Sequence, residues 1–359
     1  MDQVFIIRLS SLGDVILATS VIDAVRAAWP DSAITFIVKE EYAPVLDQNP
    51  ELSRVLVLKP AQRGLLSLWR LGRGLRREGA DLVLDLQGGP RGRALSAAIG
   101  SRRVARADSR RISRMLMTAR PARWRRQLPH AVERYLECLR RWTDGAALSR
   151  GPRVWLTDIE KSKARAALQK TGIAPTVALA PGAKWRSKRW PERSFAQLAG
   201  ALALEGSRVV VVGSEDEEPL VRRIVAAADD ADLVSGICGG LRSLAAAFSA
   251  CGAAVCNDSG LMHLAAAVGT PTLGIFGPTA PHFGFAPYGA GHETLWLGFE
   301  CSPCSLHGDK PCRIAEKAPC MEDIDPGMVL SALRSMFRVA GEGRSDRRSD
   351  RTRTLGGNR

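Results

Sequence analysis

The stretch Ala253–Thr279, AAVCNDSGLMHLAAAVGTPTLGIFGPT, contains the pattern that decides the fold of this chain. A short apolar run, Ala253–Cys256, predicts a buried strand, and Leu261–Val268 predicts an Ala-rich helix. A second apolar run, Thr272–Phe276, predicts the next strand. A strand that leads directly into a helix and then into another strand is typical of a parallel α/β sheet.

A polar turn, Asn257–Gly260, joins the first of these strands to the helix. Such a turn leaves free backbone N–H groups at the carboxyl edge of a sheet, which suits the phosphates of a nucleotide. The alternative is that Asp258 or Ser259 only caps the helix. The turn by itself does not separate these two interpretations.

The alternation of strands and helices extends over most of the chain and restarts near its middle, after an extended crossing segment, Gly151–Leu156. We therefore expect two Rossmann-like, doubly wound α/β domains facing a central cleft, residues 1–155 and 156–340, followed by a disordered basic tail at 341–359. The predicted strands are Val4–Arg8, Ala33–Val38, Val55–Leu58, Asp81–Leu86, Thr176–Ala180 and Arg208–Val212, and the predicted helices include Asp14–Ala28, Glu40–Gln48, Leu65–Glu78 and His130–Arg141.

The chain has 359 residues and a net charge of +14, and the positive charge is concentrated. Residues 101–150 contain 14 Arg and only four acidic residues. This favours an anionic partner such as a membrane surface or an acidic glycolipid, although a solvated basic face is the alternative. Nucleic acid is disfavoured, because the block shows no recognition-helix or zinc-finger pattern. No apolar run approaches the ~20 residues that span a bilayer, and without a signal peptide pattern we expect a cytoplasmic protein.

The first candidate catalytic residue is Asp14, which follows the first predicted strand. A carboxylate at the carboxyl end of a parallel strand can act as a general base on a substrate hydroxyl, and the alternative is a helix N-cap. The turn before it lacks both G-x-G-x-x-G and the P-loop pattern. This absence counts against a dehydrogenase and against a kinase or ATPase.

Two loops of the second half carry further candidates. Arg186 or Lys188, in the basic loop Pro181–Pro191, can neutralise a leaving diphosphate, unless the loop is only an exposed basic surface. Glu217, at the end of the acidic loop Gly213–Glu217, can bind ribose hydroxyls, unless it only marks the acidic start of a helix.

Taken together, these motifs resemble those of glycosyltransferase family 9, the ADP-heptose–lipopolysaccharide heptosyltransferases of Gram-negative bacteria. The resemblance extends over about residues 4–335, with the motifs in the order of the family. It rests on Leu12–Asp14, His130–Arg134, Pro181-Gly182, Lys188–Pro191, Asn257–Ala267 and Phe276–Thr279.

The resemblance implies a GT-B fold, with the acceptor on the N-terminal domain and the nucleotide sugar on the C-terminal domain. It implies an inverting transfer of heptose from ADP-L-glycero-D-manno-heptose to a hydroxyl of the inner-core lipopolysaccharide, with no catalytic metal and no cofactor. Asp14 then matches the catalytic base. The donor-binding matches and candidates are Gly182, Arg186, Lys188, Glu217, Asp258, Ser259, Gly260 and His263. Lys184 and Trp185 depart from the pattern, because some members of the family carry hydroxyl residues there.

The acceptor implied by the resemblance bears acidic sugars and phosphates at the cytoplasmic leaflet of the inner membrane, which gives the basic block a target. Arg63, Arg91 and Arg93 are candidate acceptor-binding residues, because they are predicted to lie in loops of the N-terminal half. Peripheral association with the membrane is then expected. The alternatives are the same fold with another nucleotide sugar or acceptor, and a non-catalytic protein that binds polyanions or membrane surfaces.

Four of the eight cysteines form a cluster, C-x2-C-x7-C-x7-C, near the C-terminus. Close cysteines in a cytosolic chain suggest structural zinc, but the second pair lacks the short spacing that zinc sites use. Reduced structural thiols are therefore expected, with zinc as the alternative, at Cys301, Cys304, Cys312 and Cys320.

Overall fold

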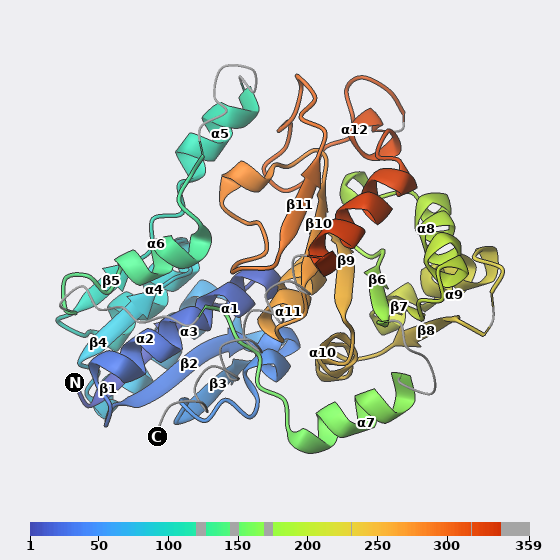
Figure 1. Ribbon diagram of the computed structural model, residues 1–359. Coiled ribbons are helices and arrows are strands. Elements are labelled where there is room, and N and C mark those ends of the chain that lie inside the picture. Colours follow the sequence, from blue (N-terminus) through green and yellow to red (C-terminus); the bar gives the residue numbers. More distant parts are fainter. Residues whose placement is uncertain (120–126, 144–150, 169–174, 231, 317, 339–359) are drawn as a thin grey trace, which may run out of the picture.

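The computed structural model describes residues 1–119, 127–143, 151–168, 175–230, 232–316 and 318–338. Its strands form two parallel sheets, with the orders β3-β2-β1-β4-β5 and β11-β10-β9-β6-β7-β8 (Figure 1). The predicted pair of doubly wound α/β sheets is confirmed. The predicted tail, residues 341–359, lies outside the described residues, and the domain boundary at residue 155 stays a prediction.

The first sheet is built from short Val-, Ile- and Leu-rich strands that are covered by helices on both faces, as parallel sheets require. Val4 and Ile6 of β1 face the core beneath α1 (Leu12–Ala18) and α2 (Ser20–Ala28). Phe5 and Ile7 face the core beneath α3 (Leu65–Leu75) and α4 (Pro90–Ile99). The strands are β1 (Gln3–Ile7), β2 (Ala33–Lys39), β3 (Arg54–Leu58), β4 (Leu82–Asp85) and β5 (Val104–Arg106).

The second sheet follows the same plan. Val177 and Leu179 pack against α8 (Glu192–Leu204), α9 (Glu218–Ala227) and the helical residues 326–338. Ala178 and Ala180 face α10 (Leu241–Ser249) and α11 (Gly260–Ala267). The strands are β6 (Val177–Ala180), β7 (Val209–Gly213), β8 (Val234–Cys238), β9 (Ala253–Asn257), β10 (Thr272–Phe276) and β11 (Glu293–Trp296).

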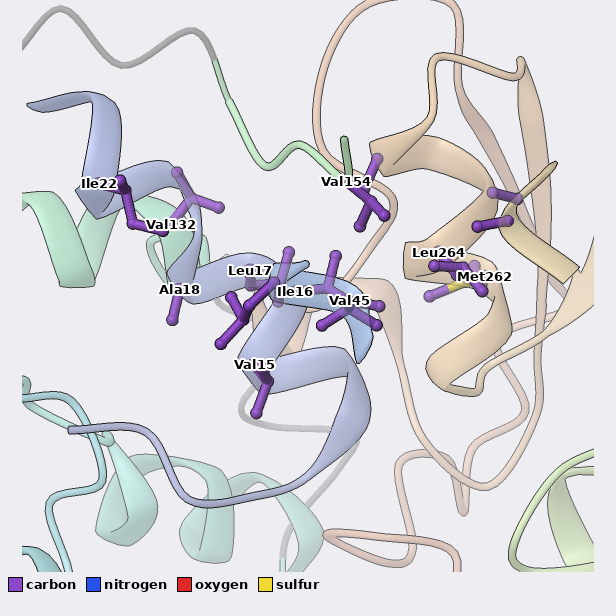
Figure 2. Packing of buried hydrophobic residues seen from close by; sticks show 14 of the residues in the cluster. Val15, Ile16, Leu17, Ala18, Ile22, Val45, Val132, Val154, Met262 and Leu264 are labelled. Carbon is purple, nitrogen blue, oxygen red and sulfur yellow. The ribbon is translucent and has the colours of Figure 1, made fainter. Parts of the chain in front are cut away.

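One hydrophobic core connects the two sheets. Buried residues of α1 and α2 belong to the same cluster as buried residues of α10 and α11. Figure 2 shows side chains of α1 and Val45 on one side of this core, with Met262 and Leu264 of α11 on the other. The two halves therefore meet through the helices that follow β1 and β9, which are the helices that begin with the predicted site residues.

Local chemistry explains where the helices differ from the sequence prediction. The predicted helix Asp14–Ala28 is two helices, α1 and α2, because the hydroxyls of Thr19 and Ser20 donate to the carbonyls of Ile16 and Leu17 at 2.7 Å and replace the regular ladder. Other segments were predicted too long: η1 (Glu40–Leu46) is a 3-10 helix that contains Pro44, and α6 covers only Ala131–Glu137. The sequence pattern did not predict strands β5, β8 and β11 or helix α5 (Arg111–Ala119).

The guanidinium of Arg242, on α10, ties the two halves together at the crossing segment. It donates to both carboxylate oxygens of Glu160 on α7 (Asp158–Leu168), each at 2.6 Å, and to the Trp155 carbonyl at 3.1 Å. It also donates to the carbonyls of Pro44 and Asp47, in and after η1, at 3.2 and 3.1 Å. Hydrogen bonds from Arg242 lower the pKa of Glu160 to about 2, against the raising effect of partial burial.

The substitution Arg242→Ala is expected to lower the free energy of unfolding by about 2 kcal/mol, since it removes a charged donor from five oxygen contacts, four of them partly buried. Urea denaturation measures the change. The matched control is Arg222→Ala, which removes an exposed i,i+4 pair with Glu218 within one helix and should cost at most about 0.5 kcal/mol.

The pH dependence supplies a second check on the Arg242–Glu160 pair. Because the folded pKa of Glu160 lies below its ordinary value of 4.5, the stabilisation is fully present above that value and is lost as the pH falls toward about 2. An equal effect of Arg242→Ala and Arg222→Ala, or a difference between them that does not shrink as the pH falls toward about 2, would contradict this role.

Candidate functional site

The turn between β9 and α11 has an uncapped helix N-terminus. Ser259 occupies the N-cap position but makes no capping hydrogen bond, and within the described residues its buried Oγ has no partner. The Asp258 carboxylate does not cap either, because it is bonded elsewhere. The capping interpretation of this turn is therefore wrong, and the N–H groups of the first turn of α11 are left for another acceptor.

Lys188 lies beside this turn. It belongs to η4 (Arg186–Lys188), and its Nζ donates to Asp258 Oδ2 at 2.6 Å. The Thr279 hydroxyl donates to the same oxygen at 2.6 Å. Burial would raise the pKa of Asp258, but the nearby Lys188 ammonium and these hydrogen bonds outweigh it and hold that pKa below its usual value. The predicted basic loop and the predicted polar turn are thus brought together by an ion pair whose side chains are only 14 and 12% exposed.

Asn257 fastens the basic loop to the end of β9. The fully buried Asn257 side chain donates to the Pro181 carbonyl at 2.7 Å and accepts from the Trp190 N–H at 3.0 Å. These two contacts hold both ends of the loop that carries Lys188. The sequence analysis quoted Asn257 only as part of a polar turn, and its position directly before Asp258 was the available signal.

The predicted ribose-binding residue lies against the start of the same loop. A Cβ atom on Gly182 would be 2.0 Å from Glu217 Oε1, so only glycine lets the carboxylate approach this backbone. The Ser214 N–H donates to Glu217 Oε2 at 2.9 Å, which makes Glu217 part of a capping box as well. Arg186, in contrast, is exposed on η4.

Asp14 closes a capping box at the start of α1 and also forms an ion pair. Its Oδ2 accepts from the Ser11 N–H at 3.2 Å, as in a capping box. Its Oδ1 lies 2.7 Å from an Arg8 guanidinium nitrogen and accepts from the Tyr135 hydroxyl at 3.3 Å. Burial would raise the pKa of Asp14, but the Arg8 charge and the Ser11 hydrogen bonds lower it, so the carboxylate is ionised at neutral pH.

The charges of both carboxylates act on His263. A Cβ atom on Gly13 would be 2.5 Å from His263 Cδ2, and one on Gly260 would be 2.6 Å from Leu12 Cδ2, so α1 and α11 meet through two glycines. Burial lowers the pKa of His263 to about 4, with the charges of Asp258 and Asp14 opposing it. His263 is therefore neutral at pH 7, and within the described chain its buried Nδ1 has no hydrogen-bond partner.

The three predicted acceptor residues lie on two elements of the N-terminal half, with Arg63 at the end of η2 (Pro60–Gln62) and Arg91 and Arg93 on α4. Arg63 forms an ion pair with Glu41. The prediction that Arg91 and Arg93 lie in a loop is wrong, because both are exposed residues of the first turn of α4, which starts one residue after Gly89. Pro90 supports this early start, since its fixed φ suits the first helical position.

The structure adds two arginines that the sequence analysis did not single out. The guanidinium groups of Arg114 on α5 and Arg134 on α6 lie 5.1 and 5.2 Å from the centroid of the Phe285 ring. Burial lowers the pKa of both, and the charge of Arg134 further lowers that of Arg114. Their buried Nε atoms have no partner among the described residues. Arg134 belonged to the quoted segment His130–Arg134, which was the signal available.

The four clustered cysteines line one pocket, together with Ser187 and Pro278. All four thiols are free. In the described ranges, no group of three or more His, Cys, Asp or Glu side chains is arranged to hold a metal ion, so the zinc alternative gains no support. The segment has a structural contact with the site instead, because Gly308 packs against Lys188 and accepts a hydrogen bond from Ser187.

The two doubly wound parallel sheets have the architecture of the GT-B glycosyltransferases. The chain belongs to glycosyltransferase family 9, the heptosyltransferase family, whose sequence model matches residues 68–313. The family and the fold that the sequence predicted are thereby confirmed.

Curated relatives and solved structures agree with this assignment. Lipopolysaccharide heptosyltransferase 1 of Pseudomonas aeruginosa is 30% identical over 317 residues, covering 84% of this chain and 86% of the relative. Lipopolysaccharide heptosyltransferase 2 of Salmonella typhimurium is 28% identical over 300 residues, covering 78% and 84%. The structure of the Escherichia coli ADP-heptose lipopolysaccharide heptosyltransferase II has a TM-score of 0.71 at 24% identity, covering 95% of this chain and all of that one.

A Gly13→Ala substitution is expected to force α1 and α11 apart, because the added methyl group meets the ring of the buried His263. Overpacking of this kind costs about 1–3 kcal/mol, and it should also lower transferase activity by displacing Asp14. Thermal unfolding and a transfer assay measure both effects. Gly74→Ala, on α3, is the matched control, since an added Cβ atom there would have no neighbouring heavy atom within 4 Å. Equal melting temperatures for the two variants would rule out the tight contact.

Proposed function

We propose that this protein is an inverting glycosyltransferase that moves heptose from ADP-L-glycero-D-manno-heptose to a hydroxyl of the inner-core lipopolysaccharide. The observation that supports this proposal most directly is the uncapped start of α11. The Ser259 hydroxyl, which has no partner among the described residues, and the Lys188 ammonium lie beside it. An uncapped helix start with an adjacent cation binds an anion of the size of a diphosphate. The names of the relatives, lipopolysaccharide heptosyltransferases 1 and 2, support the choice of sugar and acceptor.

In the proposed donor complex, the first-turn N–H groups of α11, at Gly260 and beyond, and the Ser259 hydroxyl contact the diphosphate. Lys188 neutralises the charge that develops on it, so that no catalytic metal or other cofactor is needed. Asp258 holds Lys188 in place, and the neutral His263 can donate to or accept from the donor without adding charge. Glu217, beside Gly182, binds the ribose hydroxyls, and Arg186 lies at the exposed side of the same loop.

Asp14 is the proposed base. Its ionised carboxylate takes the proton of the acceptor hydroxyl while the hydroxyl oxygen attacks the anomeric carbon of the heptose. The bond from that carbon to the diphosphate breaks, and ADP leaves toward Lys188 and the start of α11. Because one displacement from the face opposite the leaving group forms the product, the configuration at the anomeric carbon is inverted.

For the acceptor, we propose that the N-terminal half supplies cations that bind its acidic groups. Arg63, Arg91 and Arg93 remain candidates, and Arg114 and Arg134 join them because their buried guanidinium groups have unpartnered nitrogen atoms. Because such an acceptor is anchored in a lipid, we propose that the enzyme works at the cytoplasmic face of the inner membrane. Nucleic acid is not among the proposed partners.

The Asp14→Asn variant tests the base. We expect kcat to fall roughly 10²- to 10⁴-fold, while ADP affinity in calorimetry stays within about twofold, because the donor site lies on the other sheet. Asp81→Asn, at the amino edge of the same sheet, is the control and should keep full turnover. Full turnover by Asp14→Asn would remove the base assignment.

Assays with ADP-heptose and other nucleotide sugars, on Kdo- and heptose-terminated acceptors, test donor and acceptor identity.

The pH profile of kcat/KM follows from the lowered pKa values of Asp14 and His263. Both groups keep their catalytic form, carboxylate and neutral imidazole, above about pH 5. The rate should therefore be flat on the acidic side down to about that pH and fall only below it. A limb that titrates between pH 6 and 7 in wild type, and disappears in His263→Gln, would contradict the neutral buried imidazole.

Lys188→Met and Lys184→Met separate the phosphate role from general positive charge in the loop. Lys188 is paired with Asp258, whereas Lys184 is exposed near the ring of Trp185. We expect Lys188→Met to lower kcat/KM for the donor by roughly 10²-fold and Lys184→Met to change it by less than about threefold. Equal losses would assign the effect to loop charge alone.

The non-catalytic alternative makes a different prediction. It would be favoured if the wild-type protein bound polyanions in a salt-sensitive way and turned over no nucleotide sugar.

A further inference from the structure

Helix α5 exposes an apolar face that no other described element covers. Ile112, Met115 and Leu116 are 76, 50 and 45% exposed, and their i, i+3, i+4 spacing places them on one side of the helix. Scattered exposed hydrophobic residues are normal on a protein surface, but three on one face of a nine-residue helix form a patch. Figure 1 shows α5 projecting beyond the two sheets.

The opposite side of α5 is already occupied. Met117 is buried in a small cluster with Leu128 and Phe283, and Arg114 stacks on Phe285. These contacts fix the rotation of the helix, so the face that carries Ile112 is held outward and does not turn into the protein.

The charges around the exposed face have one dominant sign. Arg110 and Arg111 precede the apolar residues and are exposed, and α5 itself contains no acidic residue. One acidic side chain lies near the start of the helix: Asp108, whose Oδ2 is 3.0 Å from Arg110 Nε. Apolar side chains flanked by arginines match the two layers of an anionic lipid surface, in which acyl chains lie beneath negative headgroups.

We propose that the outward face of α5 docks the enzyme onto an anionic lipid bilayer, with Ile112, Met115 and Leu116 inserted among the acyl chains and Arg110 and Arg111 at the headgroups. This rests on the proposed function only in that the acceptor is a lipid. Docking through α5 would also place the lipid surface beside Arg114, one of the proposed acceptor-binding residues, which lies on the inner side of the same helix.

Vesicle flotation tests the proposal with the full-length chain. Wild type should float with phosphatidylethanolamine vesicles that contain about 30% phosphatidylglycerol and should not float with neutral phosphatidylcholine vesicles. About 0.5 M NaCl should weaken the binding, because it screens the arginines. The triple substitution I112S/M115S/L116S should lower the bound fraction at least about fivefold, and Arg111→Glu should lower it at low salt.

The control triple, I159S/L204S/M328S, removes exposed apolar side chains of similar size from the other half of the chain and should bind like wild type. Circular dichroism and thermal unfolding confirm that both triples are folded. Equal binding of wild type and the α5 triple, or no vesicle binding by wild type, would overturn the proposal. Dimers in sedimentation that only the α5 triple loses would also overturn it, since they would show a second copy covering the face.

The transfer assay distinguishes failure of this proposal from failure of the proposed function. With a delipidated, water-soluble acceptor saccharide, the α5 triple should keep the wild-type kcat and KM, whereas with the lipid-anchored acceptor in vesicles its rate should fall. If wild type does not transfer heptose at all, the proposed function fails, and the flotation result still decides the docking surface.

Discussion

The close approach of α1 and α11 is the contact on which the site depends. Two glycines allow it, since Gly13 leaves room for the ring of His263 and Gly260 leaves room for the side chain of Leu12. Both helices start at the carboxyl edge of a parallel sheet, and each carries candidate site residues in its first turn. Packing the two starts against each other brings Asp14 of one half near Ser259 and Asp258 of the other. The apolar core behind this contact, with Met262 and Leu264, makes the arrangement rigid.

Pairing of buried charges governs the electrostatics of the site. Asp14 is neutralised by Arg8 and Asp258 by Lys188, because an unpaired buried carboxylate would be too costly and would take up a proton. The same pairs keep both carboxylates ionised at neutral pH. The proposed diphosphate at α11 would meet a cation that already has a partner, so Asp258 limits the positive charge that the site presents. His263, held neutral by burial, adds none.

Regular, strongly apolar elements were predictable, and elements that depend on their surroundings were not. The central strands β1, β4, β6 and β9 are short runs of large apolar or Ala residues that are buried on both faces, which is the signal that periodicity detects. The missed strands β5, β8 and β11 lie at the ends of the sheets, where one side is open and the sequence need not be apolar throughout. The break between α1 and α2 was missed because it depends on hydroxyl hydrogen bonds at Thr19 and Ser20.

The sequence by itself determined the two α/β halves, the family, and the residue types at the start of α1, in the Lys188 loop and in the Asp258–Gly260 turn, because each is a local pattern at a strand end. Only the tertiary structure decided which of them meet. It showed that Lys188 is held by Asp258, that Arg91 and Arg93 are helical and exposed, and that Arg8, Tyr135 and Asn257 position the candidate groups. It also showed the opening stretch to be an uncapped helix start. These outcomes depend on contacts between residues as far apart in the sequence as Gly13 and His263, which a local pattern does not encode.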